Sequence, residues 1–337
     1  MEKFKIYFVP SAWQDEEMLG RKVREFQERA LEGLNCKTVE DESDIEFEDG
    51  VYHVVLPLAC PLVRGEDVAK LVKSMRLRGA KRVRFCDSSA FVQLGKGEKR
   101  EIFVSISAFF EISDAKSYSL VYNMLKDRIV SRHLANGAVI YDRVSTFIDD
   151  TVEIAGDAKI LPFCRIQGNT RIEQGALVAA SFVEDSIVHA GARVDSSHVV
   201  CSKIGEGATI GPFARLRGAT IGKGCRIGDF VEVKASTIGD GTKSAHLTYI
   251  GDATVGERTN VGCGTVFCNY DGERKHKTTV GSDCFVGANT NLVAPINIGD
   301  NCFVAAGTTL DGDLPDDTFA IGRSCTKTKF NTHKRKD

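Results

Sequence analysis

The sequence predicts a parallel β-helix preceded by a small α/β domain. Two observations support this prediction, namely a six-residue repeat of aliphatic side chains and an excess of glycine in the same part of the chain. The 337 residues include 32 glycines, and most of them follow Gly137. This change in composition predicts two domains at residues 1–135 and 136–325, followed by a basic tail at 326–337.

The first domain alternates strand-like and helix-like segments, as α/β domains do. Short apolar runs predict strands at residues 5–9, 51–58, 81–86 and 100–106. Helical spacing of apolar residues predicts helices at residues 16–34, 65–80 and 117–134. The pair Asn136–Gly137 is the expected stop signal of the last helix.

After Gly137, aliphatic residues recur at every sixth position. A helix requires apolar spacings of three and four and an isolated strand a spacing of two, so a spacing of six over about 170 residues indicates a solenoid of short strands. The aliphatic residues point inward, and small residues allow the chain to turn each corner. Their regularity argues against a disordered glycine-rich tract. The repeat includes Ile148, Ile154, Ile160, Ile166, Ile172 and Val178, then, with single deletions, Ile204, Ile210, Leu216, Ile221, Ile227 and Val233, and finally Val280, Val286, Leu292, Ile298, Val304 and Leu310.

Two segments interrupt the repeat, Glu184–Ser197 and Cys268–Thr279. Loops on a rigid scaffold are where functional residues concentrate. The second segment, CNYDGERKHKTT, is polar, basic and aromatic. We therefore expect it to cover a substrate.

The composition excludes several classes of function. With 44 basic and 46 acidic side chains the formal charge is -2, which argues against a nucleic-acid or membrane-surface partner. No stretch approaches the roughly 20 apolar residues of a membrane span, and acidic residues appear too early at the N-terminus for a signal peptide. The 11 cysteines show neither CxxC pairs nor zinc-ligand spacing, so we expect free thiols, no metal and a cytoplasmic location.

The run from Ile210 to Arg323 resembles the C-terminal acetyltransferase domain of a bifunctional bacterial enzyme family. That family combines N-acetylglucosamine-1-phosphate uridylyltransferase and glucosamine-1-phosphate N-acetyltransferase activities. The segments KSAHLTYIGDA and CNYDG carry the resemblance, which is weaker over Asn136–Thr209. It implies a left-handed β-helix and a homotrimer with sites between subunits. It also implies acetyl-CoA as co-substrate and acetylation of the 2-amine of glucosamine 1-phosphate.

His246, in KSAHLTY, is the candidate catalytic base. A sugar amine with a pKa of about 8 must lose a proton before it attacks a thioester, and imidazole titrates near neutral pH. The alternative is an ordinary surface histidine; the resemblance favours the base.

The resemblance also assigns binding residues. Cationic side chains suit a sugar phosphate, and the phosphate-binding positions of the family fall on Arg217, Lys234 and Lys275. Its sugar-contacting positions fall on Tyr249 and Asn260. The positions that line its acetyl-CoA site fall on Cys263, Asn269, Tyr270, Ala288, Ala306 and Arg323. Two departures are Gly218, where the family often has proline, and Ala288, where some members have serine.

The first domain resembles the uridylyltransferase half of the same family only faintly, over PLACPLVRGEDVAKLVKSM. Ala59 stands where the family has a metal-binding aspartate. The N-terminal segment also lacks a glycine-rich loop that would hold phosphates. The resemblance therefore implies a shortened remnant without uridylyltransferase activity.

Three other functions are considered. Galactosamine 1-phosphate as acceptor stays open, because distinguishing epimers depends on the geometry of hydrogen bonds. A non-catalytic trimeric scaffold also stays open, although all of the polar site residues are present. A zinc carbonic anhydrase on the same solenoid needs three converging histidines, and the spacing does not provide such a set among His189, His198, His246 and His276.

Overall fold

The computed structural model describes residues 4–96, 101–322 and 328. Contacts within the chain divide it into two compact units. The first unit consists of Met1–Arg132 and Ile148–Thr151, and the second of His133–Phe147 and Val152–Asp337.

The first unit contains a six-stranded mixed sheet with the strand order β4-β1-β5-β7-β6-β8. Strands β1, β4 and β5 are parallel, β7 is antiparallel to both β5 and β6, and β8 is parallel to β6. Buried side chains form a core cluster on each side of the sheet. The strands are β1 (Phe4–Val9), β4 (Cys36–Thr38), β5 (Tyr52–Pro57), β6 (Arg82–Phe85), β7 (Phe91–Leu94) and β8 (Glu101–Val104).

The helices of this unit match two of the three predicted ones. The predictions at residues 65–80 and 117–134 are confirmed by α2 (Gly65–Arg78) and α3 (Ala115–Ala135). Two 3-10 turns, η1 (Glu42–Asp44) and η2 (Ser107–Phe109), are the other helical elements of the described residues in this unit.

The predicted helix at residues 16–34 is wrong in its first half. Strands β2 (Glu17–Met18) and β3 (Arg21–Lys22) form a hairpin there, and the helix α1 spans only Val23–Ala30. The hairpin turns through Leu19 and Gly20, which have φ angles of 49° and 79°. The carbonyl of Leu19 accepts a hydrogen bond from the backbone N–H of Asp150 at 2.9 Å, so a contact distant in sequence fixes this turn.

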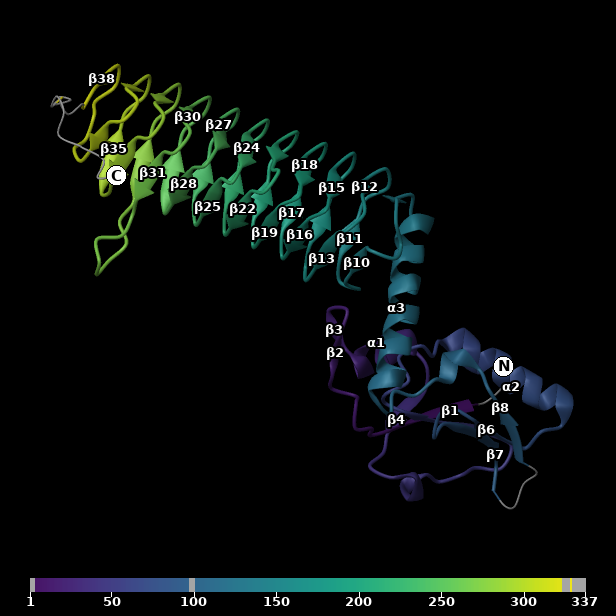
Figure 1. Ribbon diagram of the computed structural model, residues 1–337. Coiled ribbons are helices and arrows are strands. Elements are labelled where there is room, and N and C mark those ends of the chain that lie inside the picture. Colours follow the sequence, from purple (N-terminus) through teal and green to yellow (C-terminus); the bar gives the residue numbers. More distant parts are fainter. Residues whose placement is uncertain (1–3, 97–100, 323–327, 329–337) are drawn as a thin grey trace, which may run out of the picture. The chain divides into compact units, whose positions relative to one another are not determined.

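The second unit is a left-handed parallel β-helix, as predicted. Three strands per coil form three parallel sheets, called here face 1 (with β10), face 2 (with β11) and face 3 (with β9 and β12), and the coils follow one another from teal to yellow in Figure 1. Face 1 contains β10 (Phe147–Ile148), β13 (Arg165–Gln167), β16 (Phe182–Glu184), β19 (His198–Val200), β22 (Arg215–Arg217), β25 (Glu232–Lys234), β28 (Tyr249–Gly251), β31 (Val266–Cys268), β34 (Asn291–Val293) and β37 (Thr309–Leu310). Face 2 contains β11 (Glu153–Ile154), β14 (Arg171–Ile172), β17 (Ile187–Val188), β20 (Lys203–Ile204), β23 (Thr220–Ile221), β26 (Thr237–Ile238), β29 (Ala253–Val255), β32 (Thr278–Val280) and β35 (Ile296–Ile298). Face 3 contains β9 (Val139–Ile140), β12 (Lys159–Ile160), β15 (Leu177–Ala179), β18 (Arg193–Asp195), β21 (Thr209–Ile210), β24 (Arg226–Asp229), β27 (Lys243–His246), β30 (Asn260–Val261), β33 (Phe285–Val286), β36 (Phe303–Val304) and β38 (Phe319–Ala320).

The aliphatic repeat forms the interior of the solenoid. Ile160, Ile166 and Ile172, one from each face, are fully buried. Each pairs in register with the aliphatic residue of a neighbouring coil, for example Ile160 with Val178. Burying such a side chain contributes roughly 1.5–3 kcal/mol, so the repeat that is visible in the sequence supplies the main stabilising term.

Glu184–Ser197 is not an inserted loop, contrary to the sequence prediction. It contains β17 and β18 of a regular coil, with Val188 and Val194 fully buried. The aliphatic spacing falls from six to five because a buried serine closes the corner. Ser197 Oγ donates to the carbonyl of Asp195 at 2.6 Å and accepts the N–H of Ala214 from the next coil at 3.1 Å. The hydroxyl thus satisfies main-chain groups at a tightened turn.

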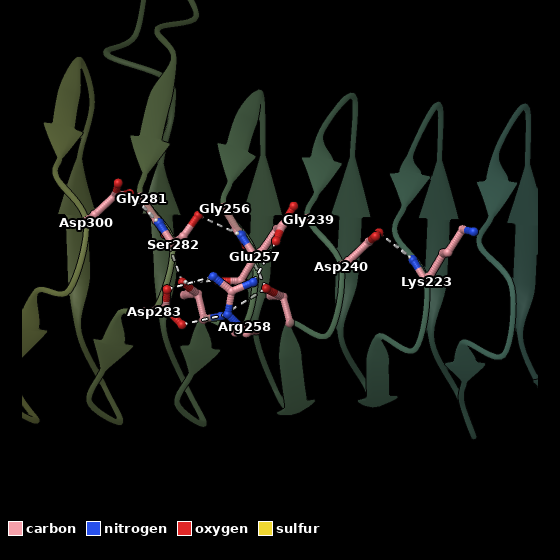
Figure 2. Close-up of polar contacts among 12 residues, drawn as sticks. Lys223, Gly239, Asp240, Gly256, Glu257, Arg258, Gly281, Ser282, Asp283 and Asp300 are labelled. Atoms are coloured by element: carbon pink, nitrogen blue, oxygen red, sulfur yellow. Dashed lines mark hydrogen bonds and ion pairs between the residues drawn. The ribbon is translucent and has the colours of Figure 1, made fainter.

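A row of polar side chains follows the corner between faces 2 and 3 (Figure 2). Asp240 Oδ1 accepts the backbone N–H of Lys223 at 2.7 Å, and Ser282 Oγ accepts that of Glu257 at 3.1 Å. Asp300 Oδ1 in turn accepts the N–H of Ser282 at 2.7 Å. Each side chain therefore satisfies a corner amide of the preceding coil.

No helix among the described residues is long and apolar enough to cross a membrane.

The serine corners lead to a test of stability. Ser202 Oγ donates to the carbonyl of Val200 at 2.7 Å and accepts the N–H of Ala219 at 3.0 Å. Ser202→Ala leaves both groups without this partner, which should lower the free energy of unfolding by about 1–3 kcal/mol. Thr220→Ala, on the exposed side of β23, is the matched control and should change it by less than about 0.5 kcal/mol. Equal shifts of the denaturant midpoint for the two variants would contradict this role of the hydroxyl.

Candidate functional site

Three predicted cationic residues gather beside face 1. Arg217 at the end of β22 and Lys234 at the end of β25 are register partners on adjacent strands. Lys275 reaches them from the loop Cys268–Thr279, and its amine lies near the amine of Lys234. Residues 58 positions apart in sequence therefore present their positive charges together.

The pKa values of the two lysines reflect this crowding. The nearby Lys275 amine raises the pKa of Lys234 above its ordinary value, and the carboxylate of Asp252 acts in the same direction. The nearby amine and charge of Lys234 lower the pKa of Lys275, and the charge of Arg217 adds to this effect. Three cations held at close quarters favour an anion between them.

Two carboxylates, which the sequence analysis did not identify, hold these cations. Glu232 contacts the guanidinium of Arg217. Asp252 Oδ2 lies 3.5 Å from Lys234 Nζ and 2.5 Å from Asn269 Nδ2. Glu232 stands two residues before Lys234 in β25, so strand alternation places both on the outer side. The spacing of Glu232 and Lys234 was visible in the sequence. The contact of Asp252 with Asn269 depends on the fold of the loop.

Tyr249 and Asn269 belong to the same cluster. Tyr249, in β28, pairs in register with Glu232. Its hydroxyl lies 3.5 Å from Nδ2 of Asn269, whose side chain is almost entirely buried. The structure therefore places Asn269 next to the cations that the resemblance assigns to the sugar phosphate.

The loop Cys268–Thr279 is held by its own contacts, and in Figure 1 it extends from the coil beyond β31. Tyr270 and Lys275 form an antiparallel β-bridge. Asp271 accepts the backbone N–H of Arg274 at 2.6 Å and contacts His276 Nε2 at 2.6 Å. These hydrogen bonds hold the pKa of Asp271 well below its usual range. The carboxylate thus stabilises the turn that places Lys275.

His246 lies at the end of β27 on face 3, where its side chain is 54% exposed. Asp229, its register partner on β24, has Oδ2 3.9 Å from His246 Nδ1. A carboxylate on the Nδ1 side favours the tautomer that leaves Nε2 free to accept a proton. Leu247, with φ 48°, turns the corner toward Tyr249 on face 1. His246 therefore lies at the corner where the face 1 strands begin, whereas Arg217 and Lys234 lie where these strands end.

A column of small side chains continues from His246 along this corner. Register pairing places the inward residues of β27, β30, β33 and β36 in line, from Ser244 to Val261 and onward. The residues two positions later are aligned as well, because the carbonyls of Cys263 and Ala288 accept backbone N–H groups of the next coil at 2.8 Å. The column consists of Asp229, His246, Cys263, Ala288 and Ala306. The three residues of this column that follow His246 are therefore all small.

The remaining predicted residues lie elsewhere. Asn260 begins β30 on face 3 and pairs with Lys243, so it shares a sheet with His246 and not with the cations. Tyr270 is 60% exposed in the loop. Arg323 lies outside the described residues.

The solenoid histidines do not converge as three zinc ligands would. His189 follows a face 2 strand and contacts Glu173 at 3.0 Å, whereas His198 on face 1 stacks on Phe182. His276 lies in the loop that follows β31. Within the part of the chain that the structure describes, no three His, Cys, Asp or Glu side chains are grouped so that they could hold a metal ion.

Comparison with known proteins identifies the family. The chain is 35% identical over 335 aligned residues to the bifunctional protein GlmU of Alkaliphilus oremlandii, which covers 94% of this chain and 69% of that protein. The chain belongs to the GlmU family. It is also 38% identical over 203 residues to the bifunctional protein GlmU of Clostridium botulinum strain Langeland, over 60% of this chain. That match spans only 44% of the Clostridium protein, so this chain aligns with less than half of its length.

Two repeat families match the solenoid of this GlmU relative. Residues 201–235 match the bacterial transferase hexapeptide family of six repeats. Residues 277–311 match the hexapeptide repeat of succinyl-transferase. The two matches lie on either side of His246 in the sequence.

The lowered pKa of Lys275 can be tested directly in this GlmU-family chain. At pH 9 the deprotonated fraction of Lys275 is enlarged, so an amine-reactive reagent should modify it measurably faster than the exposed Lys243. Lys234→Met removes the largest cause of the shift and should slow the reaction at Lys275. Peptide mass spectrometry measures both rates. An unchanged rate in Lys234→Met would contradict the pairing of the two amines.

Proposed function

We propose that this chain transfers the acetyl group of acetyl-CoA to the 2-amine of glucosamine 1-phosphate. The observation that carries the proposal is the convergence of Arg217, Lys234 and Lys275 on face 1, which the chain enters directly after the exposed His246. A phosphate among the three cations relieves their mutual repulsion. Tyr249 lies between the cations and the corner, where its hydroxyl suits the sugar ring.

The proposed reaction forms one bond and breaks one. The amine nitrogen attacks the thioester carbonyl, the new C–N bond forms, and the C–S bond to coenzyme A breaks. His246 Nε2 accepts the proton that the amine loses, and the leaving thiolate takes up a proton as the thiol. Asp229 Oδ2 lies 3.9 Å from Nδ1, so we assign the proton transfer to Nε2.

The proposed site for acetyl-CoA is the column that follows His246. Cys263, Ala288 and Ala306 are small, so a narrow chain ending in a thioester fits along them toward the imidazole. Gly287 allows its coil to lie close to the next one, since a Cβ on Gly287 would lie 2.4 Å from the backbone nitrogen of Ala306. We also propose a cytoplasmic location, which the free thiols of the ten described cysteines support.

A thiol-release assay with acetyl-CoA tests the proposal. The acceptors are glucosamine 1-phosphate, galactosamine 1-phosphate, glucosamine 6-phosphate and glucosamine. We expect the highest kcat/KM for glucosamine 1-phosphate. Preference for galactosamine 1-phosphate would change the acceptor within the same mechanism. Absence of thiol release with every acceptor would support the scaffold alternative and overturn the proposal.

The base is tested by His246→Ala. We expect kcat to fall by about 10²–10⁴-fold, the usual contribution of a positioned base. The residual rate should rise with pH, because only amine that is already deprotonated can attack. His189→Ala is the matched control and should leave kcat unchanged, since His189 lies on another face. If folded His246→Ala retains more than about a third of kcat near pH 7, His246 is not the base.

We further propose that the protein is a homotrimer with the site completed between subunits. Support comes from an exposed apolar row along the same corner, formed by Phe213, Phe230 and Leu247, which are 58%, 61% and 61% exposed. The rings of Phe213 and Phe230 stack with centroids 5.4 Å apart. Such a patch is typical of a subunit contact, and threefold closure satisfies every copy. Sedimentation should give three times the chain mass, and an active monomer at assay concentration would refute the trimer.

We propose that the first unit lacks uridylyltransferase activity. Ala59, after β5, is fully buried and carries a methyl group that cannot bind a metal. Incubation with UTP, Mg²⁺ and N-acetylglucosamine 1-phosphate should release no pyrophosphate above a blank without protein. Enzyme-dependent release that persists after further purification would contradict this proposal.

A further inference from the structure

The first unit carries a groove of about 850 Å³ that neither sequence analysis nor the acetyl-transfer proposal uses. Helices α1 and α3 line it, together with the segment between β5 and α2. All of its lining residues belong to the first unit. Its volume lies within the range that small-molecule sites occupy.

Four arginines line this groove, Arg29, Arg64, Arg128 and Arg132, against two carboxylates, Asp127 and Asp150. The groove therefore carries an excess of two positive charges. A concave surface with a net excess of one sign of charge attracts ligands of the opposite sign.

One of the two carboxylates is already neutralised. Asp150 is 2.6 Å from both Arg21 Nε and Arg132 Nη1. Burial alone would raise its pKa, but the hydrogen bonds from these two arginines outweigh that effect and hold it below the usual value. The charge of Asp150 is thus balanced by Arg21 and Arg132.

The other arginines have donors to spare, and within the described residues Arg64 uses only Nη1, in an ion pair with Glu66 Oε1 at 3.4 Å. Arg29 is exposed near the end of α1 and pairs with no carboxylate in the described part of the chain. Arg128 donates one hydrogen bond, from Nη2 to the carbonyl of Leu62 at 2.9 Å. Burial, followed by the charge of Arg64, lowers the pKa of Arg128. Its charge is therefore poorly solvated, and an incoming anion would stabilise it.

The rest of the lining is largely apolar. Phe26 from α1, Pro61 from the segment after β5, and Ile129 from α3 contribute to it. Ala59, the position that the resemblance assigns to a metal-binding residue, does not line the groove. The arrangement matches a ligand with an anionic end and an apolar body.

We propose that this groove is a binding site for an organic phosphate, a phosphate group joined to an apolar or aromatic body. The guanidinium groups of Arg29, Arg64 and Arg128 bind the phosphate oxygens, since their planar donors match phosphate geometry. The apolar body packs against Phe26 and Ile129. A nucleoside phosphate and an alkyl phosphate share this chemistry. The proposal is independent of acetyl transfer, whose residues lie in the second unit.

The test is calorimetric titration of the full chain with four probes. These are cytidine diphosphate, hexyl phosphate, inorganic phosphate and cytidine. We expect cytidine diphosphate, hexyl phosphate or both to bind at least about tenfold more tightly than inorganic phosphate, and we expect cytidine not to bind. The two organic probes separate the nucleotide source from the alkyl source. Binding should weaken as salt is raised.

Arg29→Glu is the decisive variant, because Arg29 is exposed and its replacement should not disturb folding. It should weaken binding at least about tenfold. Arg78→Glu makes the same change of charge on an exposed position of α2 outside the groove and should alter the dissociation constant less than about twofold. The unfolding midpoint verifies that each variant is folded. The proposal is overturned if no organic phosphate binds, if inorganic phosphate binds equally well, or if Arg29→Glu binds as the unmodified protein does.

Discussion

The parallel pairing of each coil with the next is the constraint on which the solenoid depends. Every strand is too short to be stable alone, so its backbone groups and its inward aliphatic residue are satisfied only by neighbouring coils. Ile160 illustrates this, since it pairs with Ile140 on one side and Val178 on the other. The register of the stacked coils therefore fixes the positions of the outward-facing residues.

The candidate site depends directly on this register. Strands β22, β25 and β28 repeat at intervals of 17 residues, so Arg217, Lys234 and Gly251 align at the same position of successive coils. Only Lys275 requires an irregular segment, and the turn at Asp271 supplies it. A scaffold of regular coils with one ordered loop can therefore concentrate charge that would separate in a flexible chain.

Both proposed sites hold like charges close together, but they do so by different means. In the solenoid, Glu232 and Asp252 counter part of the charge of Arg217 and Lys234, while Lys275 adds to it. In the first unit, burial keeps Arg128 away from water. In each case the folding of the unit offsets the repulsion, and a bound anion would relieve it.

The sequence by itself determined the solenoid, its inward column and the strands β1 and β5, because six-residue and strand periodicities follow from local geometry. It also pointed to His246 and to the three cations. It failed for the hairpin at Leu19, which depends on a hydrogen bond from Asp150, and for Glu184–Ser197, where buried serines shorten the repeat. Only the tertiary structure brought Asn269 to Tyr249, since contacts between separate coils and the loop are set by register and not by local sequence.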